Sequence, residues 1–163
     1  YKRQHPVCAT LCQIAHESAT AVGATVHQGG TYVCMEGPQF STLAESRLYR
    51  SWEMDVIGMT NLQEAKLARD AEICFATLGV VSDYDCWHTV HSHVTVDMIV
   101  DNLQRNAHMA QQIIKAVIAR LPVERACECA TALETAIITR PEVIPEETRI
   151  KLAPLVGKYL DKM

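Results

Sequence analysis

The sequence predicts an α/β fold with a mixed central sheet flanked by helices. Apolar residues repeat at helical spacing in several segments, and short apolar runs bounded by turn residues lie between those segments. The longest apolar run, residues 73–81, is continuous, which is typical of a strand buried on both faces of a sheet. Because no linker divides the 163 residues, they are expected to form one domain, 1–163.

Boundary residues predict the elements of the first half of the chain. A helix over residues 10–22 ends at Gly23, and one bent or two short strands follow within 26–35. Thr42 followed three residues later by Glu45 is a capping-box pattern, which predicts a helix from there to about residue 52.

The second half follows the same alternation. A short strand at 55–57, a helix over 61–71 and the strand 73–81 are expected in that order. A long helix with one apolar stripe then begins at Thr95. A last helix begins near Pro145 and is expected to be interrupted near Pro154.

Composition and charge exclude several classes of partner. The net charge is −4, and Lys and Arg are not clustered, so no nucleic-acid partner is expected. No stretch approaches the roughly 18 apolar residues of a membrane span, so no membrane partner is expected. An export signal is also missing from the sequence, which favours a cytoplasmic location.

The sequence gives little indication of a metal site. His88, His91 and His93 have no acidic or Cys partner at a ligand spacing, so they are interpreted as loop or lid residues and no metal is expected. Seven cysteines, several of them in apolar segments, favour reduced thiols. The pair Cys127 and Cys129 leaves two alternatives, a strained disulfide or two free thiols, and a reducing compartment favours the thiols.

Three loops are candidates for a ligand site, because ligands of open α/β sheets bind beyond the carboxyl ends of strands. They are residues 36–41, 58–60 and 82–85. In the last of them, Asp83 and Asp85 flank a tyrosine. A carboxyl in a dry site can hold a proton for purine N7, and a second carboxylate can accept from an exocyclic amine. The alternative is a solvated turn with local capping, which the spacing alone favours.

Taken together, Glu-Gly-Pro-Gln-Phe-Ser at 36–41, Gly-Met-Thr at 58–60 and Ser-Asp-Tyr-Asp-Cys-Trp at 82–87 resemble the trimeric purine nucleoside phosphorylase family. The resemblance is strongest to its methylthioadenosine phosphorylase branch and runs from about residue 23 to 121, more loosely to the end. It implies phosphorolysis of S-methyl-5'-thioadenosine to adenine and 5-methylthioribose 1-phosphate. It also implies a homotrimer, with inorganic phosphate as co-substrate and no metal or organic cofactor.

The resemblance assigns the residues around the base. Asp83 matches the group beside purine N7 and is the expected general acid, and Asp85 matches the carboxylate near the 6-amino group. An Asp at position 83, where the 6-oxopurine branch carries Asn, favours 6-aminopurines. Phe40 matches an aromatic residue that packs on the base or sugar, and Ser41 matches a position associated with the choice of adenine.

It also assigns the residues around the sugar and phosphate. Met59 matches a ribose contact, and its alternative is core filling. Thr60 matches a phosphate contact, and it can also cap the following helix. Val96 and Ile99 match residues that line the 5'-methylthio pocket. Their alternative is the core stripe of the long helix.

The family's other phosphate contacts, a Ser or Thr in a Gly-rich loop and an Arg-His pair, have no counterpart in this sequence. The chain, which starts at Tyr1, is therefore expected to be the C-terminal, purine- and ribose-binding part of a phosphorylase domain. The N-terminal half is expected in the same or another chain. Two other functions stay open: a phosphorylase of 6-oxopurine nucleosides, and a non-catalytic half-subunit.

Overall fold

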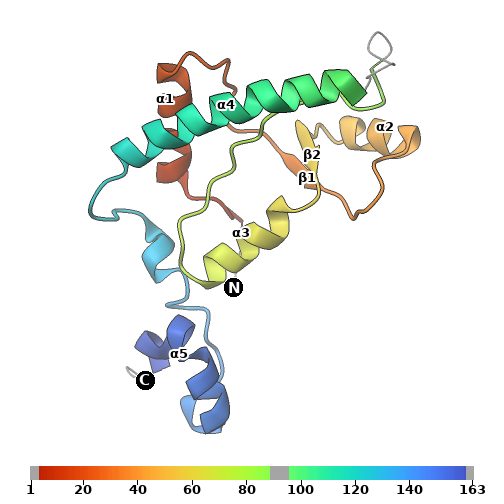
Figure 1. The fold of residues 1–163 in the computed structure, drawn as a ribbon. Coiled ribbons are helices and arrows are strands. Elements are labelled where there is room, and N and C mark those ends of the chain that lie inside the picture. The colour runs from red at the N-terminus through yellow and green to blue at the C-terminus, as the bar shows by residue number, and fades with distance from the viewer. Residues whose placement is uncertain (1–3, 89–95, 161–163) are drawn as a thin grey trace.

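The computed structural model describes residues 4–88 and 96–160 (Figure 1). Helices and short strands alternate along the first part of the chain, and helices dominate the rest, so the predicted α/β class is confirmed. The elements are α1 (Ala9–Ala21), β1 (Tyr32–Cys34), α2 (Leu43–Ser51), β2 (Val56–Gly58), α3 (Asn61–Asp70), α4 (Val96–Arg120), the 3-10 helices η1 (Glu128–Thr131) and η2 (Pro141–Val143), and α5 (Glu146–Leu160).

The sheet within the described ranges consists of β1 and β2, which pair in parallel with Val33 opposite Ile57. The connection between them contains α2, as a parallel pair requires. Beyond the strands, the Met35 N–H still donates to the Gly58 carbonyl at 2.9 Å. Gly58 is fixed by packing, because a Cβ at this position would collide with the hydroxyl of Tyr32.

The prediction of a buried strand at 73–81 is wrong for the described structure. The segment runs from the end of α3 back toward α4 and pairs with no other strand in residues 4–88 and 96–160 (Figure 1). Ile73 and Val81 are 58% and 66% exposed. The backbone N–H and C=O groups of a strand need hydrogen bonds to a paired strand, and neither β1 nor β2 pairs with this segment. Its apolar pattern indicates a buried position that the described residues leave uncovered.

The main helix packing is between α1 and α4, where Ala19 and Ile113 are buried. Arg120 of α4 donates to the hydroxyl of the fully buried Ser18 at 3.3 Å. The core is small for the length of the chain: its surface is 12268 Å². A compact monomer of this mass would expose about 8,100 Å².

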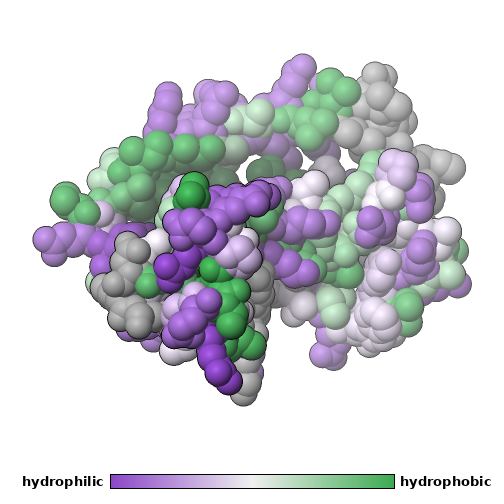
Figure 2. Space-filling view, turned by 90° about the horizontal axis from the view of Figure 1, so that it is seen from below, coloured by the Kyte–Doolittle hydropathy of each residue, from purple (hydrophilic) through white to green (hydrophobic). Residues whose placement is uncertain are grey.

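Large apolar side chains therefore reach the surface in several separate areas, as Figure 2 shows. Among the helices that the structure describes, none is both long and apolar enough to cross a membrane.

The C-terminal part, residues 125–160, is held to the rest of the fold through Glu72. This residue is only 7% exposed. Its carboxylate accepts from the Leu133 N–H at 3.0 Å, from the Tyr159 hydroxyl and from the Lys158 ammonium group. Arg125 donates to the Glu72 carbonyl at 2.8 Å. Burial raises the pKa of the Glu72 carboxyl, but the hydrogen bonds from Lys158, Tyr159 and Leu133 outweigh it, so the pKa is lowered overall.

The helix α5 is continuous, so the expected interruption near Pro154 is wrong. The proline lies inside the helix and removes only the one hydrogen bond that its missing N–H would have made to the turn before it. In Figure 1, α5 projects away from the sheet at the lower end of the molecule.

Candidate functional site

The first two candidate loops meet at one edge of the sheet. Because β1 and β2 are parallel, residues 35–41 and 59–60 leave the sheet at the same end. Met59 is half-buried, and its sulfur lies so near Gly37 that a Cβ there would be 2.8 Å away. The Cys34 thiol donates to the Met59 carbonyl at 3.0 Å. Met59 is therefore fixed between the strand end and the first loop, as a ribose contact or as packing.

The third loop reaches the same place, although no strand leads to it. The Cys86 thiol donates to the Ser41 carbonyl at 3.7 Å. The Arg50 guanidinium from α2 lies over the Trp87 ring, 3.7 Å from its centroid. A cation held over an aromatic ring contributes about 0.5–1 kcal/mol at an exposed site. The first loop thus contacts the second through Met59 and the third through Cys86.

Two residues that the sequence analysis missed hold this loop from α4. Asn102 donates to the Ser82 carbonyl at 3.3 Å, and Asn106 donates to the Val81 carbonyl at 3.2 Å. Four residues apart, they share one face of the helix. Asn is a poor helix former, so two of them at this spacing in a long helix were the available signal.

Asp83 is exposed and forms a local turn. One oxygen of its carboxylate accepts from the Asp85 N–H at 2.8 Å, and the other accepts from the Ser82 hydroxyl at 2.8 Å. Asp85 has a φ of 61°, in the left-handed region that Asp tolerates, and accepts from the Cys86 N–H at 2.7 Å. This is the local capping that the sequence left open. A dry environment for the Asp83 carboxyl does not come from the described residues.

A cleft of about 190 Å³ lies beside the first loop. Ser41 borders it and donates to the Met35 sulfur at 3.2 Å, while Phe40 is 82% exposed at its rim. Glu45 also borders the cleft, and hydrogen bonds from the Thr42 N–H and hydroxyl lower the pKa of its carboxyl. The full lining is Met35, Glu36, Gln39, Phe40, Ser41, Glu45 and Tyr49.

The remaining predicted residues fall into two groups. Thr60 is the N-cap of α3, is exposed and makes no capping hydrogen bond through its side chain, so its hydroxyl is not used for the cap. Val96 and Ile99 lie in the first turn of α4, but their side chains are outside the part of the chain that the structure describes. His91 and His93 are outside the described residues as well, and the His88 ring stacks on Tyr84 at 4.8 Å.

The family model of the phosphorylase superfamily matches residues 2–119, a range that contains all three loops and both asparagines. The chain belongs to the phosphorylase superfamily. A relative within it, the S-methyl-5'-thioadenosine phosphorylase of Gloeobacter violaceus, is 58% identical over 159 residues, which are 94% of this chain and 53% of that protein.

Solved structures of the superfamily agree with this similarity. A methylthioadenosine phosphorylase from an antarctic soil metagenomic library has a TM-score of 0.87 and 42% identity, and the match covers 94% of this chain and 55% of that chain. The methylthioadenosine phosphorylase from Schistosoma mansoni in complex with adenine has a TM-score of 0.71 and 26% identity over 80% of this chain and 51% of that chain. The chain therefore spans about half the length of the relatives that it matches.

Proposed function

We propose that the protein carrying this chain is an S-methyl-5'-thioadenosine phosphorylase and that the chain supplies its purine and ribose site. The observation that carries the proposal is the meeting of the three loops at one end of the β1–β2 pair, joined by the Met59–Gly37 packing and the Cys86–Ser41 contact. The names of relatives up to 58% identical support the same activity.

The reaction transfers a methylthioribosyl group from adenine to phosphate. A phosphate oxygen forms a bond to C1', the C1'–N9 bond breaks, and its electron pair goes to adenine, which gains a proton at N7. We assign this proton to the carboxyl of Asp83, which then regains one from solvent. General acid catalysis of this kind is worth about 10²–10⁴-fold in rate. Asp85 accepts from the 6-amino group of the base, which a 6-oxopurine lacks.

The remaining residues are assigned to the ribose, the phosphate, the base and the methylthio group. Met59 contacts the ribose, and Thr60 donates to phosphate from the start of α3, where the helix dipole favours an anion. Phe40 and Ser41 contact the base, and Val96 and Ile99 line the pocket for the methylthio group. Phosphate is a co-substrate, and the scheme uses no metal or organic cofactor.

We further propose that additional protein completes this site: an N-terminal half, in the same or another chain, and neighbouring subunits of a homotrimer. The uncovered apolar segment 73–81 and the exposed Phe40 support this proposal, because both need a covering surface. Closing the site would also exclude water from Asp83 and allow its carboxyl to hold a proton. We place the activity in the cytoplasm.

Two alternatives remain, and an observation favours the first of them. The locally capped, exposed carboxylate of Asp83 favours a subunit that binds purine without turning it over. A phosphorylase of 6-oxopurine nucleosides would use the same loops with a different preference for the base.

The test measures adenine release from S-methyl-5'-thioadenosine and phosphate, and hypoxanthine release from inosine, by the purified protein. We expect phosphate-dependent adenine release and a much lower rate with inosine. A preference for inosine would establish the oxopurine alternative. Calorimetric binding of adenine without any turnover would establish the non-catalytic one, and the absence of both binding and turnover would overturn the proposal.

A further inference from the structure

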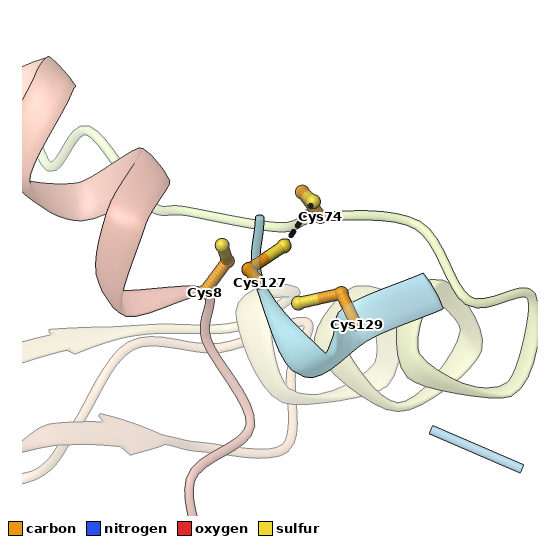
Figure 3. A group of neighbouring side chains, drawn as sticks. All are labelled: Cys8, Cys74, Cys127 and Cys129. Carbon is orange, nitrogen blue, oxygen red and sulfur yellow. Dashed lines mark hydrogen bonds between the residues drawn. The ribbon is translucent and has the colours of Figure 1, made fainter. Parts of the chain in front are cut away.

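Four cysteines from three separate segments meet beyond the C-terminal end of α3 (Figure 3). Cys8 is the N-cap of α1, Cys74 follows α3, and Cys127 and Cys129 lie at the start of η1. Their four sulfur atoms all lie within 4.8 Å of one another, and all four thiols are free of disulfides. The ten residues of α3 put about 15 Å between this cluster and Thr60.

The spacing of the sulfur atoms is that of a tetrahedral metal site. Four thiolates at about 2.3 Å from a zinc ion stand about 3.8 Å from one another. The Cys74 and Cys127 sulfur atoms are 3.3 Å apart, and no pair in the cluster exceeds 4.8 Å. Small side-chain rotations therefore bring all four to bonding distance. We propose that Cys8, Cys74, Cys127 and Cys129 bind one Zn²⁺ ion in a closed structural site.

The surroundings of the cluster suit a negatively charged metal centre. Zinc with four thiolates carries a net charge of −2, so donors around the sulfur atoms stabilise it. The Leu11 N–H donates to the Cys8 sulfur at 3.5 Å, and Arg69 donates to the Cys129 sulfur at 3.9 Å. Cys8 and Cys129 are buried, at 3% and 6% exposure, which shields two of the four ligands from solvent.

Zinc binding at this place would join elements that otherwise share few contacts. Each of the four thiols gives up its proton to solvent as its sulfur bonds the metal, and no electron is transferred. The site would link the start of α1, the chain after α3 and η1. The Cys8 N–H already donates to the Phe75 carbonyl at 2.7 Å, within the segment that leads to Asp83. The ion would therefore anchor the C-terminal part and the base of this segment together.

The sequence alone did not reveal this site, because the four ligands are far apart in it. Only Cys127 and Cys129 are neighbours, and a C-x-C pair alone does not distinguish a metal site from free thiols or a disulfide. The fold brings Cys8 and Cys74 to that pair.

The experiment measures metal content and ligand geometry. The protein is purified under reducing conditions and its zinc is quantified by mass spectrometry of the metal. The zinc is then replaced by Co²⁺. We expect one zinc per chain, and the cobalt form should show the intense charge-transfer and visible bands of tetrahedral thiolate coordination. Cys127→Ser and Cys74→Ser should each reduce the bound zinc severalfold, whereas Cys86→Ser, an exposed thiol outside the cluster, should keep it.

A second measurement does not depend on the folding of the variants. Thiol alkylation of the unaltered protein, mapped by mass spectrometry, should spare the half-buried Cys74 and Cys127 with zinc bound and label them after chelation, while Cys86 reacts in both states. A folded protein without the cobalt bands would overturn the proposal, as would a disulfide within the cluster after reducing purification. Because neither readout involves phosphorolysis, failure here leaves the proposed enzymatic activity untouched.

Discussion

Two regions of the molecule are built in opposite ways. One is the sheet edge where residues 35–41, 59–60 and 82–87 form the candidate site, and the other is the junction where Glu72 meets the C-terminal part of the chain. At the edge, Asp83 and Phe40 are exposed, and single contacts such as Cys86–Ser41 hold the loops. At the junction, one buried carboxylate accepts from three donors in the C-terminal part of the chain. The comparison shows that the junction around Glu72 is buried and fully paired, whereas the candidate site lies on an open surface. Changes at the edge should therefore alter activity, and changes at the junction should alter stability.

The largest expected effect tests the edge. Asp83→Asn in the protein that turns over methylthioadenosine should lower kcat/KM for adenine release by about 10²–10⁴-fold, because Asn cannot donate a proton to N7. It should also raise the ratio of inosine to methylthioadenosine turnover. The melting temperature should stay the same, since Asp83 is exposed. Asp101→Asn, at another exposed acid, is the matched control. Unchanged adenine release would exclude Asp83 as the acid.

The next effect tests the junction. Glu72→Gln should lower the free energy of unfolding by about 1.5–3 kcal/mol, the range for hydrogen bonds to a charged group. Urea denaturation measures it, with Glu124→Gln at an exposed position as the control. Lys158→Met should have a smaller effect, because Lys158 is half-exposed. If Glu72→Gln were as stable as the unaltered protein, the junction would not depend on this carboxylate.

The same junction predicts a dependence of stability on pH. The pKa of Glu72 is lowered in the folded state from its ordinary value of 4.5, so the unfolded chain binds more protons than the folded one in the acid range. The contribution of Glu72 is complete above about pH 4.5 and is lost as the pH falls through the lowered folded-state pKa. Denaturation midpoints across pH 3–7 should converge for the unaltered protein and Glu72→Gln at the acid end. A constant gap across that range would contradict the assignment.

The smallest effect concerns α2, the helix that borders the candidate site. Thr42→Ala removes the capping box of α2, in which the Thr42 hydroxyl accepts from the Glu45 N–H at 3.3 Å. The expected loss is about 1 kcal/mol of unfolding free energy. Thermal denaturation measures this loss. The control is Thr20→Ala in α1, where the hydroxyl donates to the His16 carbonyl of the same helix and caps nothing, so no comparable loss is expected. Equal losses in both variants would show that the cap is not the cause.

Local patterns predicted the local elements well. The spacing of Thr42 and Glu45 gave the start of α2 within one residue, and the boundary at Thr60 and Asn61 gave α3. The three loops were combined into one candidate site by a resemblance that used all of them, since no single loop indicates a site. These features depend on residues that are near one another in the sequence or on motifs read together.

Contacts between distant segments that belong to no recognised motif could not be predicted. The apolar run 73–81 predicted a strand, but a strand also requires a partner, which no residue within the run can reveal. Glu72 gave no sign that it would collect donors from residues 133–159, and Cys8 and Cys74 gave no sign that they would meet Cys127. In each case the fold, rather than the spacing, brings the groups together.

The two hydrogen bonds donated by the side-chain amides of Asn102 and Asn106 couple α4 rigidly to the third loop. The helix has 25 residues and is therefore about 37 Å long, rigid on the scale of a reacting bond. Its far end is gripped by α1 through Arg120 and Ser18, and its near end holds the main chain just before Asp83. A tilt of the far end would therefore displace the backbone just before Asp83. The position of the Asp83 carboxylate thus depends on how α1 packs against α4.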